Sequence, residues 1–115
     1  GIIRLSSIKY SEAISDFTKA IELNSNDLIN YYLRGICIRF STKEKSELLK
    51  AISDFCLVIK NKEISDAYVH IGHCELELGN YKTAINYFKK AIQINPNLEN
   101  DHDQYIPKKI IEFEE

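Results

Sequence analysis

The sequence predicts an all-α fold, a solenoid of about three helical hairpins stacked side by side and followed by a C-terminal capping helix. The first observation is an internal repeat: the motif Ala-Ile-x-x-Phe occurs at residues 13–17, 51–55 and 84–88, at offsets of 38 and 33. Offsets in this range indicate stacked helical repeats. The second observation is that apolar residues recur at helical spacing around each copy. The third is the scarcity of helix breakers, with two prolines and four glycines.

The first repeat is assigned to residues 1–24. If Ala13 occupies the place of Ala84, then Gly1 falls on the place of Gly72, and the first helix of this repeat lacks its opening turn. We expect residues 1–6 to be a frayed stub, because so short a helix is unstable alone. We also expect the natural protein to continue upstream, and residues 10–23 to form the second helix.

The second repeat is assigned to residues 27–61, and the polar turn before it offers several N-cap side chains. Its helices are expected at residues 28–40 and 48–59. Gly35 and Ala51 are 16 residues apart, whereas Gly72 and Ala84 are 12 apart, so four residues are inserted. The insertion falls in the charged segment 41–47, which we interpret as a solvated loop extension. A longer helix and a specific contact surface are the alternatives.

The third repeat, residues 65–96, is the most regular copy. Gly79-Asn80 is expected to break its two helices, since both residues tolerate the backbone angles of a helix end. Pro96 is expected to stop the second helix. Gly35 and Gly72 lie inside helices, and we expect them to let the two helices of each hairpin approach closely.

The remaining segment, residues 97–115, is interpreted as one capping helix broken at Pro107. Repeat arrays need such a cap, because a terminal repeat otherwise leaves its apolar face uncovered. The alternative is that this segment docks in a groove of its own chain or of a neighbour.

The third copy also carries a recognisable set of residues. An aromatic residue, a glycine, a Leu-Gly-x-Tyr turn and then alanine, phenylalanine, alanine and proline follow one another at the spacing of a 34-residue repeat. The positions are Tyr68, Gly72, residues 78–81, Ala84, Phe88, Ala91 and Pro96. The chain therefore resembles the tetratricopeptide repeat (TPR) family over residues 1–96. This resemblance implies a right-handed α-α superhelix and a scaffold that binds other proteins, not an enzyme.

Composition argues against several other function classes. A net charge of -2 provides no basic surface for nucleic acid. No apolar run is long enough to span a membrane, and no phosphate-binding loop or nucleophile motif is present, so we expect no cofactor and no catalytic residue. The odd count of three cysteines favours free thiols and a cytoplasmic location.

A metal site is the weak alternative that would make the chain an enzyme. His70, His73 and Cys74 lie within about one helical turn, and their side chains are of the types that bind zinc. We nevertheless expect no metal, because Cys74 should point into the hairpin core while His73 should point to the groove.

The resemblance places the binding site on the concave face. In this family the first helix of each repeat lines an inner groove, through residues at fixed positions around the repeat glycine. The expected contact residues are Ile29, Tyr32, Ile36, Arg39 and Phe40 in the second repeat, and Asp66, Val69, His73, Leu76 and Glu77 in the third.

This lining differs from that of the family members that grip the acidic tails of heat-shock chaperones. Those members place asparagines directly after the repeat glycine, where this chain has Ile36 and His73. We therefore predict that binding does not use such a carboxylate clamp. The apolar, aromatic-edged groove suits a protein partner that offers an amphipathic helix or an extended apolar peptide, with Arg39 attracting acidic groups. Self-association through the first repeat or the C-terminal segment is the alternative.

Overall fold

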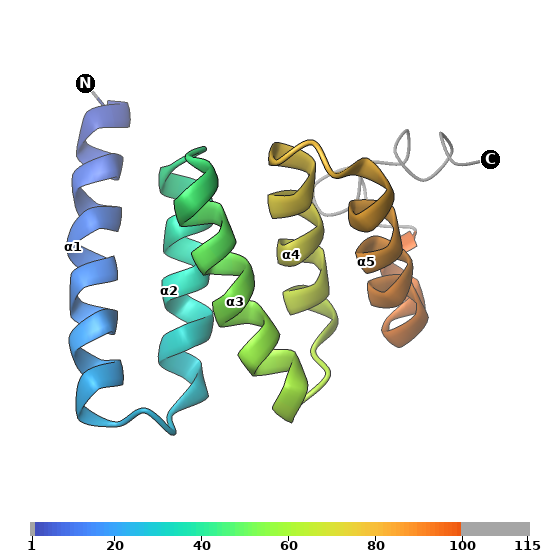
Figure 1. The fold of residues 1–115 in the computed structure, drawn as a ribbon, viewed down its shortest axis with the longest axis horizontal. Coiled ribbons are helices and arrows are strands. Elements are labelled where there is room, and N and C mark those ends of the chain that lie inside the picture. The colour runs from blue at the N-terminus through green and yellow to red at the C-terminus, as the bar shows by residue number, and fades with distance from the viewer. Residues whose placement is uncertain (1, 100–115) are drawn as a thin grey trace.

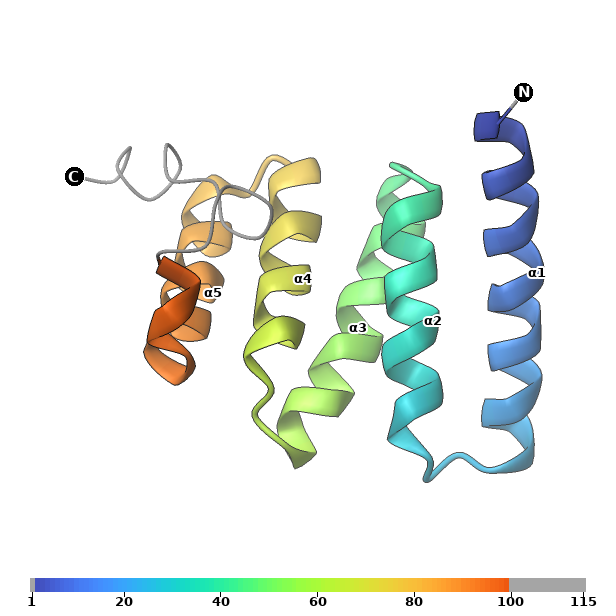
Figure 2. The same ribbon diagram turned by 180° about the vertical axis from the view of Figure 1, so that it is seen from behind.

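The computed structural model describes residues 2–99 of the 115-residue chain, with side chains described for residues 9–97. The described part is an all-α helical repeat solenoid without strands. Its elements are α1 (Ile2–Leu23), α2 (Leu28–Ser41), α3 (Lys45–Asn61), α4 (Ser65–Glu77), α5 (Tyr81–Ile94) and a short 3-10 helix, η1 (Pro96–Glu99). The helices stand side by side in chain order, and α3 lies in front of α2 in Figure 1 and behind it in Figure 2.

The start of the chain differs from the expectation of a frayed stub followed by a separate helix. Residues 2–23 form one continuous helix, α1. In the alignment of the repeats, Ile8 takes the place of Gly79, whose φ of 85° ends α4. A β-branched residue strongly disfavours this left-handed conformation. The chain therefore has no residue here that would make the turn, and the helix continues through it.

The four-residue insertion is absorbed by the helices, so the prediction of a loop extension was wrong. The connection between α2 and α3 spans residues 42–44, the same length as the connection at 78–80. Instead, α2 extends one residue further beyond Gly35 than α4 extends beyond Gly72, and α3 begins three residues earlier than α5.

The predicted breaks fall where expected. Asp27 caps α2 by accepting a hydrogen bond from the backbone N–H of Ile29. At the end of α4 the N–H of Asn80 bonds to the carbonyl of Glu75 at 2.9 Å, and the N–H of Gly79 bonds to that of Leu76 at 3.0 Å. These are the two bonds of a Schellman motif, which requires the positive φ that glycine supplies.

The repeat glycines let the paired helices approach closely, as predicted, and each lies against an aromatic ring of the second helix. A Cβ built on Gly72 would lie 2.5 Å from the ring of Phe88, and one on Gly35 would lie 2.9 Å from the ring of Phe55. Neither distance is possible for a real side chain, so only glycine lets the paired helices approach this closely. Both rings are fully buried, and so are the motif alanines of the second and third repeats.

A buried ion pair fastens the second repeat. Arg34 on α2 donates two hydrogen bonds to the carboxylate of Asp54 on α3, both at 2.8 Å. Arg34 also donates to the hydroxyl of Thr18 on α1 at 3.4 Å. Its hydrogen bonds to Asp54 raise the pKa of Arg34. These hydrogen bonds connect α1, α2 and α3 and help to fix their positions relative to one another.

At its other end, α5 stops at Ile94, directly before Asn95 and Pro96 as expected, and η1 follows. The break proposed at Pro107 and most of the segment 97–115 lie outside the described residues.

Candidate partner-binding face

The contact residues predicted on α2 all have some exposed surface, and we call them the inner face, together with the predicted contact residues of α4 that reach the surface. Ile29 and Phe40 are the most open members, with exposed fractions of 53% and 54%. Tyr32, Ile36 and Arg39 lie between them and are half-buried. Since Ile29, Ile36 and Phe40 are seven and four residues apart, they share one side of the helix. The helix α4 follows α3 in the row of helices (Figures 1 and 2), contacts α2 directly, and supplies the rest of the face.

The contact residues predicted on α4 divide into three groups. Asp66 and Glu77 are exposed, and His73 and Leu76 are half-buried. Val69 is 1% exposed and belongs to the core between α4 and α5. A partner on the surface cannot touch it, so its inclusion among the contact residues was wrong.

A histidine that the sequence suggested only as a metal ligand proves central to this face. The ring of His70 stacks on that of Phe55, with centroids 5.3 Å apart and planes at 13°. Tyr32 and Phe40 meet it edge-on, at 5.8 and 6.5 Å. His70 thus fills the joint between α2 and α4. Its place facing the preceding repeat lies outside the family's usual contact positions, and its aromatic neighbours come from other helices, so no local signal in the sequence indicated this role.

The metal hypothesis finds no support in this geometry. Cys74 is fully buried, and burial raises the pKa of its thiol to about 12, which opposes the thiolate form that binds metals. Within the part of the chain that the structure describes, no group of three or more metal-ligating side chains converges.

Arg39 is held on two sides. Its guanidinium lies 4.3 Å from the centroid of the Phe40 ring, within the range of a cation–π contact. Its Nη1 donates a hydrogen bond to Nδ1 of His70 at 3.1 Å. Since arginine carries donors only, Nδ1 must be the acceptor, and the neutral ring therefore carries its proton on Nε2.

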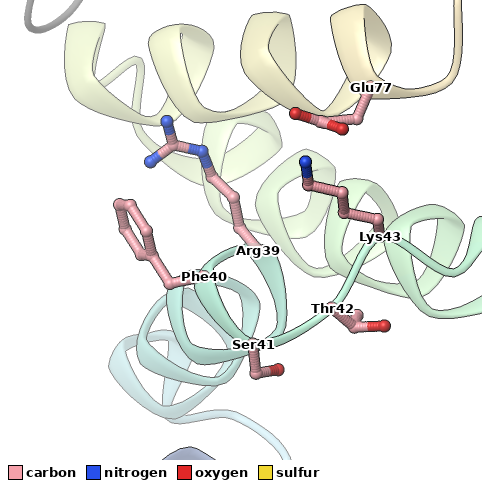
Figure 3. A pocket seen from close by; sticks show the side chains of 6 residues that line it. All are labelled: Arg39, Phe40, Ser41, Thr42, Lys43 and Glu77. Carbon is pink, nitrogen blue, oxygen red and sulfur yellow. The ribbon is translucent and has the colours of Figure 1, made fainter. Parts of the chain in front are cut away.

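A hollow of about 230 Å³ opens beside this arginine, at the end of α2 (Figure 3). Figure 3 shows Arg39 and Lys43 both reaching toward α4, which carries Glu77. Two cationic side chains and one anionic side chain therefore line the hollow. It is lined by Arg39, Phe40, Ser41, Thr42, Lys43 and Glu77.

The charge state of His70 predicts how stability depends on pH. Burial, then the charge of Arg39, then that of His73, lower its pKa from 6.5 to about 4. Between these values the unfolded chain binds more protons at His70 than the folded chain does, so stability rises with pH in this window. The contribution is fully present above pH 6.5 and is lost as the pH falls to about 4. We expect it to be about 2–3 kcal/mol after allowing for partial solvent contact.

The measurement is urea unfolding at several pH values between 4 and 7, on the unmodified protein and on His70→Asn. Carboxylates also titrate near the lower end, and the variant retains them as an internal control. The unmodified protein should lose stability more steeply than the variant on acidification. Parallel curves would show that His70 is not neutral and buried as described.

A second hollow, of about 400 Å³, lies on α4 and α5. It lies apart from the inner-face residues, and the one cation that lines it, Lys90, is paired with Glu63 at 3.8 Å. Its lining residues are Tyr68, Thr83, Asn86, Tyr87 and Lys90. We find no feature there that would select a ligand.

Comparison with known proteins agrees with the geometry. The family model for the tetratricopeptide repeat matches residues 65–98. The chain is also similar to DnaJ homolog subfamily C member 3 of Gallus gallus, with 31% identity over 87 residues. That match covers 76% of this chain but only 16% of the relative. No solved structure matches the chain significantly.

Proposed function

Because the chain belongs to the tetratricopeptide repeat family, whose repeats generally mediate protein–protein interaction, we propose that it is a scaffold that holds a protein partner on its inner face. The partner segment is an amphipathic helix or an extended apolar peptide. Repeats of this family typically act as non-enzymatic scaffolds, and we propose no reaction for this chain. None of the described helices is both long enough and apolar enough to cross a membrane.

The observation that carries the proposal is the open apolar stripe on α2. Phe40 and Ile29 expose about half of their surface, and Ile36 lies between them. Covering such side chains with apolar groups is favourable by about 25 cal/mol for each Å² removed from water. A helix or strand laid along α2 covers all three, and it also meets the half-buried Leu76 on α4.

Recognition by a carboxylate clamp is disfavoured in this proposal. Ile36 and His73 stand at the asparagine positions of such a clamp, and His73 packs edge-on against Phe88 with centroids 5.2 Å apart. Apolar contact therefore supplies most of the affinity, with Arg39 attracting acidic groups. We expect a dissociation constant in the micromolar range, which corresponds to a binding free energy of about 8 kcal/mol, because a face of this size holds few anchoring residues.

Substitutions of apolar residues on the inner face, one on α2 and one on α4, test the proposal. Phe40→Ala and Leu76→Glu should each weaken binding at least about tenfold, since central aromatic and apolar anchors dominate small interfaces. The measurement is a pulldown to capture a partner, followed by titration of that purified partner with each variant. Leu49→Ala and Leu49→Glu are matched controls, because Leu49 is 49% exposed but lies on α3.

Unchanged binding by both variants would remove the inner face as the site. Light scattering of the same samples examines self-association, the alternative function. If the unmodified chain has twice the mass of the monomer and this mass falls in the Phe40→Ala variant, the inner face binds a second copy of the chain and not a foreign partner. The cytoplasmic location inferred from the cysteines stays a prediction.

A further inference from the structure

The two buried or half-buried arginines of α2 differ in a way that points to a ligand. The guanidinium of Arg34 donates one hydrogen bond to each oxygen of the Asp54 carboxylate. Arg39 is half-buried, and burial lowers its pKa. Among the described residues, however, no carboxylate lies within ion-pair distance of Arg39. Glu77 acts on Arg39 only from beyond ion-pair distance. A desolvated cation without a direct ion pair is unfavourable, and a ligand that brings a carboxylate lowers this cost.

The guanidinium of Arg39 is already oriented for such a ligand. His70 accepts one of its N–H groups and the Phe40 ring covers one face. The other N–H groups have no acceptor among the described residues, and the hollow next to them is open. Holding the long side chain in advance lowers the entropy that binding costs.

We propose that Arg39 receives an acidic side chain of the partner and that His70 is the positioning residue that aims it. This inference rests on the proposed function, because the acidic side chain must come from a segment lying along α2. The apolar stripe then receives the apolar residues of that segment, while its Asp or Glu lies at the Arg39 end.

The charges around the hollow support an anion there. Arg39 and Lys43 are positive and Glu77 is negative, which leaves a net charge of about +1 at neutral pH. Figure 3 shows Glu77 across the hollow from both cations, on α4. The charge of Glu77 also acts on Arg39 and raises its pKa, but only from beyond ion-pair distance. The forked guanidinium therefore still has room for a bidentate contact with a carboxylate.

His70 fixes the arginine because its own ring cannot move freely. It is stacked on Phe55 and flanked by Tyr32 and Phe40. Two substitutions separate the hydrogen bond from the packing. His70→Phe keeps an aromatic ring in the joint but removes the acceptor, whereas His70→Asn keeps an acceptor near the Nδ1 position and removes the ring.

The test uses two synthetic peptides with blocked ends, each of about 16 residues so that they are helical in water. Both carry leucines along one face, and they differ only in one Glu or Gln near the end. Fluorescence anisotropy with the full chain measures both affinities. We expect the Glu peptide to bind about tenfold more tightly, the effect of one charged hydrogen-bonded pair. This preference should shrink in Arg39→Lys and His70→Phe and persist in His70→Asn.

The outcomes separate this inference from the proposed function. If both peptides bind the unmodified chain equally, the acidic site is overturned while the inner face stands. If the preference survives His70→Phe in a variant with an unchanged melting curve, His70 is not a positioning residue. If neither peptide binds at millimolar concentration, the inner face does not take an amphipathic helix, and both that form of the proposed function and the acidic site on it are overturned.

Discussion

Replacing Asp54 with alanine is expected to lower the free energy of unfolding by about 3–5 kcal/mol. Asp54 and Arg34 are 3% and 9% exposed, and they share two hydrogen bonds of 2.8 Å. Without the carboxylate, the guanidinium stays enclosed with a 3.4 Å hydrogen bond to Thr18 and the face of the Tyr31 ring, 5.6 Å from its centroid, and neither carries a charge. Enclosing an unpaired charge costs much more than the pair itself contributes, so this loss exceeds that of any surface pair.

Urea unfolding measures the effect, and the chain offers a matched control. Asp16 occupies the equivalent position in the first repeat and is exposed, so Asp16→Ala should change stability by less than about 0.5 kcal/mol. Replacing both partners, Arg34→Leu with Asp54→Leu, should restore most of the stability lost in the single variant. If Asp54→Ala costs less than about 1 kcal/mol, the ion pair is solvated and the described geometry is wrong.

Phe88→Ala is expected to cost about 3–5 kcal/mol, the usual range for removing a buried aromatic ring. The ring fills the space that Gly72 leaves between α4 and α5, and it also contacts His73. Without the ring, a cavity remains at the point where the two helices of the third repeat approach most closely. Thermal or urea unfolding measures this, with Phe40→Ala as the control of the same residue type. Phe40 is 54% exposed, so its loss should cost less than about 1 kcal/mol.

A second substitution tests whether the glycine is the partner of this ring. Gly72→Leu alone should destabilise the protein by forcing atoms into Phe88. In the Phe88→Ala background the same leucine partly refills the cavity, so the two changes should be strongly non-additive. Additive losses would show that Gly72 and Phe88 do not pack as described.

The repeat pattern predicted the fold well, because it depends on local signals. The break at Gly79 and the close approach at Gly72 follow from glycine in a chain of otherwise helical residues, and both are confirmed. The pattern failed where a copy departs from it. Ile8 replaces the turn glycine and lets α1 run on, and the insertion lengthens α3 instead of forming a loop.

The candidate site was harder to predict, because it depends on contacts between repeats. The hydrogen bond from Arg39 to His70 joins residues 31 positions apart, and periodicity does not indicate how the side chains of two helices meet. The same holds for Arg34 and Asp54, which are 20 positions apart. Val69 shows the opposite error, since a position that lines the groove by family pattern is closed off here by the packing of its own hairpin.

The most direct test of the inner face is nuclear magnetic resonance of the isotope-labelled chain, with and without the glutamate peptide. The account predicts that shift changes concentrate on α2 and the end of α4, at Ile36, Phe40 and Glu77. The exposed leucines of α3, Leu49 and Leu57, should not respond. Shift changes confined to α3, with α2 unaffected, would contradict the claim that this chain holds its partner on the inner face.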